Sequence, residues 1–110
     1  MKLPNRKKAY VQKEKLINYL LLETHPIGGS KAKFFRQLGF SQTNIGELIE
    51  ALLGISQSND IKETRKFEYG VNYVINGVIE APLVKRVAIT SIWFIGKDDR
   101  RPRFITAYPV

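Results

Sequence analysis

The spacing of apolar residues follows a helical period in the first half of the chain and alternates in the second half. In the first half, apolar residues recur every three or four positions, as they do on the buried side of an amphipathic helix. Proline and glycine divide this half into segments, because proline restricts the residue before it and glycine suits the end of a helix. Three helices are therefore predicted, from about Gln12 to a stop at 24–26, over 31–38, and from Ser41 to between 54 and 59.

From Ile61 onward, apolar and polar residues alternate, and β-branched and aromatic residues become frequent. Because Asn76-Gly77 is a common hairpin dipeptide, the second strand is expected either to end early there or to carry a bulge. The predicted fold class of residues 1–110 is a single α+β domain, with three N-terminal helices packed on a C-terminal four-stranded antiparallel sheet. The four predicted strands span 62–68, 71–79, 84–95 and 103–108.

Composition excludes several kinds of site. The chain has no cysteine and one histidine, so it lacks the side chains for a disulfide, a thiolate metal site or a histidine zinc site. We therefore expect packing alone to hold the domain together, with no metal and no cofactor. No apolar run approaches the roughly 20 residues that span a bilayer, and the basic N-terminus is not followed by a secretory leader. A cytoplasmic location and no membrane partner are expected.

The charge of the chain favours an anionic partner. Lysine and arginine number 18 against 10 acidic residues, which gives a formal net charge of +8. Such a field attracts polyanions and accelerates their capture. Many small basic domains owe only their solubility to this charge, so charge alone leaves nucleic-acid binding as one of two interpretations.

A segment that begins at His25 combines three features of a phosphate site. Histidine is the side chain best suited to proton transfer near neutral pH. Gly28 and Gly29 allow the backbone to approach a ligand closely, and Ser30 is expected to cap a helix whose free N–H groups can bind an anion.

Lys31 falls on the side of this helix that Phe34 and Phe35 should bury. A cation is costly there unless it is paired or faces a polar cleft. With Arg36, it supplies charge that matches a phosphate. The alternative interpretation is an ordinary glycine-rich connection with a capping histidine and a lysine that reaches water. The G-x-x-x-x-G-K-S/T spacing of a Walker loop is missing.

The last predicted strand carries a second group of polar side chains. Regular alternation over 103–108 places Phe104, Thr106 and Tyr108 on one face. Arg103 then lies on the other face. Arginine, threonine and tyrosine near a terminal strand can hold a phosphodiester and supply hydroxyl donors, although an ordinary edge strand also fits.

Three further aromatic residues have the ring chemistry to stack on nucleic-acid bases. Trp93, Tyr69 and Tyr73 lie in or beside predicted strands. Aromatic residues at such spacing are usually buried, so all three are expected in the core.

Two motifs support a resemblance to a known family. The motif H-P-x-G-x-x-K-A-x-F-F starts at His25 and T-A-Y-P starts at Thr106, and the likeness covers nearly the whole chain. It resembles a bacterial family of domains of unknown function, found alone and at the C-termini of polymorphic toxins. The predicted helices followed by an antiparallel sheet also resemble the barnase/EndoU/colicin/RelE-like (BECR) ribonuclease superfamily. Those enzymes cut RNA without metal, by attack of the ribose 2′-hydroxyl on the adjacent phosphate.

The resemblance implies an endoribonuclease, the toxin of a toxin–antitoxin or polymorphic toxin system, with RNA and an acidic antitoxin or immunity protein as partners. The alternative is a non-catalytic basic domain that binds nucleic acid. With one histidine, a second proton-transfer group must be a tyrosine, a lysine or a carboxylate such as Glu63, Glu68 or Glu80, among which the sequence does not choose. The implied catalytic residues are His25, Lys31, Thr106 and Tyr108, and the implied phosphate-binding residues are Gly28, Gly29, Ser30, Arg36 and Arg103.

Overall fold

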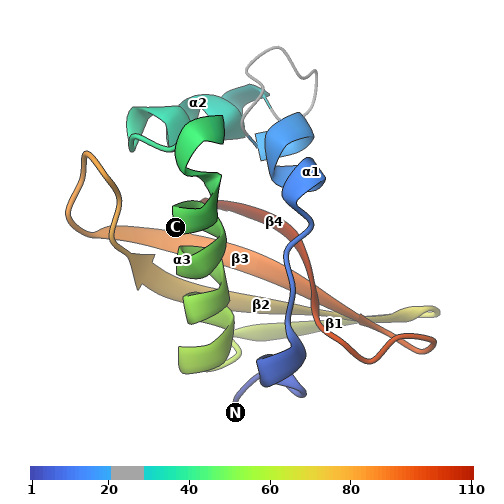
Figure 1. The fold of residues 1–110 in the computed structure, drawn as a ribbon. Coiled ribbons are helices and arrows are strands. Elements are labelled where there is room, and N and C mark those ends of the chain that lie inside the picture. The colour runs from blue at the N-terminus through green and yellow to red at the C-terminus, as the bar shows by residue number, and fades with distance from the viewer. Residues whose placement is uncertain (21–28) are drawn as a thin grey trace.

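A computed structural model describes residues 1–20 and 29–110, with the side chains of 1–18 and 31–110. Its C-terminal half is a four-stranded sheet in the order β1-β2-β3-β4, and each strand runs antiparallel to the next (Figure 1). The predicted α+β class and the C-terminal antiparallel sheet are confirmed. The strands are β1 (Glu63–Phe67), β2 (Gly70–Ile79), β3 (Val87–Gly96) and β4 (Arg103–Pro109).

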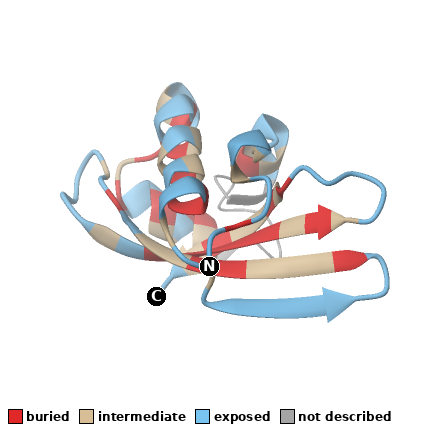
Figure 2. Cartoon of the chain, turned by 90° about the horizontal axis from the view of Figure 1, so that it is seen from below, coloured by how far each residue is buried: buried red, intermediate tan, exposed pale blue. Residues whose placement is uncertain are grey.

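The described helices lie together on one side of the sheet (Figure 2). Buried residues gather between the two layers, whereas every residue of β1 is exposed (Figure 2). Within the described ranges, no helix has the length and apolar character needed to cross a membrane. The helical elements are η1 (Arg6–Lys8), α1 (Lys13–Lys15), the π-helix η2 (Leu16–Leu20), α2 (Gly29–Gln37), the 3₁₀ turn η3 (Gln42–Asn44) and α3 (Ile45–Ser58).

The first predicted helix differs from the structure. Its α1 segment is three residues long and continues as the π-helix η2, so in the described part of the chain only α2 and α3 are long α-helices. Leu16 is fully buried, as the apolar spacing predicted. That spacing carries no information on whether an N–H bonds to the carbonyl four or five residues earlier. The prediction of three packed helices is therefore confirmed in part: the described residues form two long α-helices, and a short α- and π-helical segment stands where the first was predicted.

The core lies between α3 and the central strands. Leu48, Leu52 and Ile55 of α3 are buried against the sheet, where Trp93 is fully buried. The Trp93 indole N–H donates to Ser91 Oγ at 2.9 Å, and that hydroxyl donates to a β2 carbonyl at 2.8 Å. The side-chain polar atoms of Trp93 and Ser91 on this inner face are thus satisfied.

Contacts with α3 explain why β2 does not turn at Asn76-Gly77. The strand continues through both residues to Ile79 in regular register with β3. A Cβ at Gly77 would lie 2.8 Å from the Ile55 side chain and 2.9 Å from that of Asn59. The glycine therefore allows close packing of the helix on the strand, and the predicted early end or bulge is wrong.

The start of β3 was also predicted too early. The Ala81 N–H donates to the Val84 carbonyl at 3.0 Å, which closes a turn before the strand begins. Val84 and the two cations after it are exposed in this loop, and pairing with β2 starts at Val87. Strand β3 ends at Gly96, one residue later than predicted, and the final strand starts at Arg103 as the alternation predicted.

Candidate functional site

A bulge in β4 decides which of its side chains share a face. The register with β3 shifts by one residue, which leaves Ile105 without a partner. The prediction that Phe104, Thr106 and Tyr108 share one face is therefore wrong. Phe104 is fully buried against Trp93 beneath the helices, whereas Thr106 and Tyr108 lie on the opposite face of the sheet.

Lys31 in the first turn of α2 contacts both of these β4 residues. Its Nζ donates a hydrogen bond to Thr106 Oγ1 at 3.0 Å and lies 5.7 Å from the centroid of the Tyr108 ring. Lys31 is half-buried, beside the fully buried Ala32 and Phe35 that anchor the helix. The hydroxyl and the ring offset the cost of partly burying the ammonium. The structure thus brings together two segments from opposite ends of the chain.

Tyr108 also lines a shallow hollow of about 290 Å³. The hollow lies on the face of the sheet that carries both Tyr108 and Thr106. Thr90 lies opposite Tyr108 on one side and Asn76 on the other, and its hydroxyl donates to Asn76 Oδ1 at 2.8 Å. A row of polar side chains therefore crosses three strands. The far wall of the hollow is formed by Lys62, Glu63 and Arg65.

The position of the hollow distinguishes among the three carboxylates left open by the sequence. Glu63 lines it, and accepts a hydrogen bond from Arg65 Nε at 2.6 Å. Glu68 lies in the turn between β1 and β2, and Glu80 lines a separate groove beside α3. Glu63 is thus the carboxylate that shares a cavity with Tyr108.

The remaining predicted residues lie elsewhere or outside the description. His25 and Gly28 fall outside the described residues. Gly29 begins α2, so Ser30 lies in the first helical turn and is not the predicted cap, a shift of the size by which helix ends commonly vary. Arg36 is exposed on α2.

Arg103 lies at the opposite end of β4 from Tyr108. Its guanidinium carbon lies 5.5 Å from the centroid of the Phe94 ring, its direct neighbour on β3. Arg103 therefore belongs to a different part of the same sheet face, and its predicted role at the Lys31 phosphate site has no contact to support it.

Sequence reasoning missed the polar row at Asn76 and Thr90 and the cation Arg65. The available signal was local alternation: Asn76 follows Ile75 and Thr90 follows Ile89, and a polar residue beside a buried one in a strand lies on the face turned away from the core. Trp93 is in the core as predicted, and Tyr73 is half-buried against it. The prediction for Tyr69 is wrong: this residue sits in the β1–β2 turn, and 76% of its surface is exposed.

The side chains around Lys31 and the hollow suit a phosphate group. Lys31, Thr106 and Tyr108 supply an ammonium and two hydroxyls, which can neutralise an anion and donate hydrogen bonds to it. The guanidinium of Arg65 and the carboxylate of Glu63 lie across the hollow on β1, and Tyr108 is the residue that the two groups share. Over the described ranges, no three His, Cys, Asp or Glu side chains are grouped closely enough to hold a metal ion.

Comparisons with known proteins agree with this architecture. The profile of a family described as "Domain of unknown function (DUF6883)" matches residues 2–110. No curated protein matched. Among solved structures, a chain of the "Contact-dependent growth inhibition toxin - immunity protein complex from Klebsiella pneumoniae 342" is similar, with a TM-score of 0.73 and 23% identity over 96% of each chain. At this identity the likeness shows a shared fold.

Proposed function

The chain belongs to the DUF6883 family, and we propose that it is a metal-independent endoribonuclease that acts as the toxin of a toxin–antitoxin or polymorphic toxin system. The observation that carries the proposal is the contact of Lys31 with Thr106 and Tyr108. This contact gathers one cation and two hydroxyl-bearing side chains on the sheet face turned away from the helices. The group is of the right charge and chemistry to bind one phosphodiester.

The proposed reaction is transesterification within the RNA chain. The ribose 2′-oxygen bonds to the adjacent phosphorus, the bond from phosphorus to the 5′-oxygen breaks, and the products are a 2′,3′-cyclic phosphate and a 5′-hydroxyl. A base takes the proton of the 2′-hydroxyl, and an acid gives a proton to the leaving 5′-oxygen. Lys31 stabilises the negative charge on the phosphate oxygens. The Thr106 hydroxyl accepts from Lys31 and keeps its own proton for donation to the phosphate.

His25 is the proposed base, because an imidazole suits proton transfer near neutral pH and the H-P-x-G-x-x-K-A-x-F-F motif starts at this residue. Glu63 is the second candidate, because it lines the hollow with Tyr108. Two substitutions separate these candidates. If His25 is the base, His25→Ala removes most of the cleavage and Glu63→Gln removes little. The reverse result assigns the proton transfer to Glu63.

The toxin role is supported by the shared fold with a chain of a complex that contains a toxin and its immunity protein. The charge of +8 supports RNA as substrate and an acidic antitoxin or immunity protein as inhibitor, because complementary charge speeds association and favours the right partner. On this proposal the toxin acts in the cytoplasm, where its RNA substrate is found. Induced expression in bacteria should then arrest growth.

A comparison of two lysine variants tests the catalytic proposal. Lys31→Met should slow cleavage of labelled RNA by about a hundredfold or more, as loss of a group that stabilises the transition state does. Lys85→Met is the matched control, since Lys85 is exposed in the β2–β3 loop and its loss changes the net charge equally.

Lys85→Met should cut RNA at a rate within about twofold of the unmodified chain. Expression of Lys85→Met should still arrest bacterial growth, whereas expression of Lys31→Met should not. Equal, small effects of the two substitutions would contradict the catalytic role of Lys31. RNA binding without any cleavage would favour the non-catalytic nucleic-acid-binding domain.

A further inference from the structure

The end of the sheet away from the β2–β3 loop carries a second hollow, of about 230 Å³. It is bordered by Tyr69 of the β1–β2 turn, by part of the β3–β4 loop, and by Tyr10 of the N-terminal segment. The Tyr10 N–H donates to the Pro102 carbonyl at 2.9 Å, and the Phe104 N–H donates to the Tyr10 carbonyl at 3.0 Å. The N-terminal segment is thereby fixed beside the edge strand, and the hollow is part of the folded domain.

Aromatic rings and arginines meet in this hollow. The Arg101 guanidinium carbon lies 4.8 Å from the centroid of the Tyr10 ring, and Arg103 holds the corresponding place over Phe94. Tyr69 leaves 76% of its surface exposed at the rim. Rings and guanidinium planes are the surfaces on which unpaired nucleic-acid bases stack.

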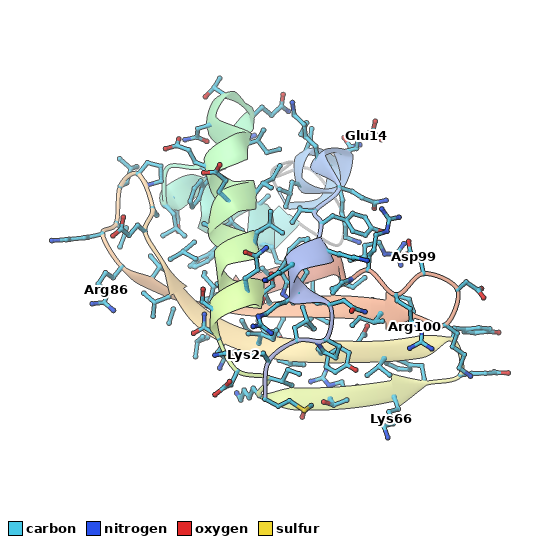
Figure 3. All side chains as sticks on the ribbon, turned by 60° about the horizontal axis from the view of Figure 1, so that its bottom comes forward. Lys2, Glu14, Lys66, Arg86, Asp99 and Arg100 are labelled. Carbon is cyan, nitrogen blue, oxygen red and sulfur yellow. The ribbon has the colours of Figure 1, made fainter. Side chains whose placement is uncertain are left out.

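The charge of the loop favours an anionic ligand. Residues 97–103 carry four cations and two carboxylates. Asp99 is paired with Arg101, whose Nη2 lies 2.8 Å from Asp99 Oδ2, and this pairing holds the Asp99 pKa at about 2. Asp99 and Arg100 project from this loop (Figure 3). The volume is below the roughly 300–1,000 Å³ of pockets for drug-sized ligands, and suits a single ring system.

The bulge in β4 connects this hollow to the phosphate site. Arg103 lies opposite Phe94, and Thr106 lies opposite Ile92, so both β4 residues are on the same face of one strand. A strand of nucleic acid laid along β4 can therefore present a base at one end and a phosphate at the other. A nucleic-acid strand bound along β4 can therefore contact both sites at once.

We propose that Tyr10, Tyr69 and Phe94, with Arg101 and Arg103, form a base-stacking subsite for single-stranded RNA. This inference rests on the proposed function and adds to it a substrate class. The RNA is expected to be single-stranded at this point, because an unpaired base can enter the hollow without the free-energy cost of breaking a base pair. It must also extend more than one nucleotide from the scissile phosphate.

Binding of a 2′-deoxy oligonucleotide tests the subsite separately from cleavage, since this strand lacks the attacking hydroxyl. Tyr69→Ala should weaken binding of a single-stranded 2′-deoxy oligonucleotide by about fivefold to a hundredfold, the range for loss of one base–aromatic stack. Tyr69→Phe keeps the ring and should bind within about twofold of the unmodified chain. Leu83→Ala is the control, because Leu83 is 73% exposed in the loop at the opposite end of the sheet.

An abasic strand of the same length completes the test. The unmodified chain should bind it more weakly, and Tyr69→Ala should then cause no further loss, since ring and base act as one pair. An equal loss on both strands, or no loss on the base-bearing strand, would overturn the subsite. So would a Tyr69→Ala variant that binds the strand normally but no longer binds the immunity protein.

Failure of the proposed function gives a different pattern. If the unmodified chain cuts no RNA but Tyr69→Ala still weakens oligonucleotide binding, the base-stacking subsite is supported and the endoribonuclease proposal is rejected. Conversely, if Lys31→Met abolishes cleavage while Tyr69→Ala changes neither cleavage nor oligonucleotide binding, the endoribonuclease proposal is supported and the base-stacking subsite is rejected.

Discussion

Individual charged residues in this protein are held by partners that fix where they point. Lys31 is half-buried and donates to a threonine hydroxyl from the far end of the chain. Arg101 is held between the Asp99 carboxylate and the Tyr10 ring at the proposed base-stacking subsite. In both cases a cation is oriented before any ligand arrives, which reduces the conformational entropy lost on binding.

The Asp99–Arg101 pair predicts a specific pH response. Hydrogen bonding from Arg101 lowers the pKa of the Asp99 carboxyl from 3.8 to about 2. Because the folded-state pKa is the lower one, the pair stabilises the loop above pH 3.8, and this contribution is lost as the pH falls toward 2. An NMR titration of the Asp99 side chain should show a midpoint near 2. Arg101→Gln should raise it toward 3.8, and a midpoint already near 3.8 in the unmodified chain would contradict the pairing.

Among the secondary-structure elements, α3 and the sheet were predictable, and the departures arise from tertiary contacts. The apolar stripe of α3 and the alternation of the strands are local signals, and both elements are present, although β3 starts at Val87 rather than at Val84. The bulge at Ile105 depends on pairing between β3 and β4, and the straight course of β2 through Gly77 depends on packing against Ile55. Neither partner can be identified from a local pattern.

Two glycine substitutions should therefore have opposite effects on stability. A Cβ at Gly54 of α3 would meet no atom within 4 Å, so Gly54→Ala should raise the free energy of unfolding by about 1 kcal/mol through better helix propensity. Gly77→Ala should lower it by about 1–3 kcal/mol, because its Cβ would overlap the side chains of Ile55 and Asn59. Denaturant unfolding measures both. A lower free energy of unfolding for Gly54→Ala would contradict this account, because it would show that the added methyl group meets a neighbouring residue.

In the whole molecule, helices cover one face of the sheet, and the polar side chains of the candidate site lie on the other face. Cations are spread widely, as Lys66, Arg86 and Arg100 show by projecting from separate strands and loops (Figure 3). This spread provides long-range attraction for a polyanion, while the sites at Lys31 and Tyr69 provide local contacts.

A catalytic role for Lys31, Thr106 and Tyr108 requires that these residues meet in the fold, but no local pattern in the sequence shows that they do. Nothing local relates two segments separated by 75 residues, and only the packing of α2 at the edge strand joins them. Tyr69 was assigned to the core because aromatic residues near strands usually pack there. Its exposure follows from the turn in which it sits, and this became visible only in the folded chain.

The central claim is cleavage by 2′-hydroxyl attack without a metal ion, and the ends of the products test it most directly. RNA incubated with the chain in excess EDTA should yield fragments with a 2′,3′-cyclic phosphate on one side of the cut and a 5′-hydroxyl on the other. The same strand with 2′-deoxyribose at the cut position should remain intact there. Fragments with a 5′-phosphate, cutting of the 2′-deoxy strand, or no cleavage in EDTA would contradict the account.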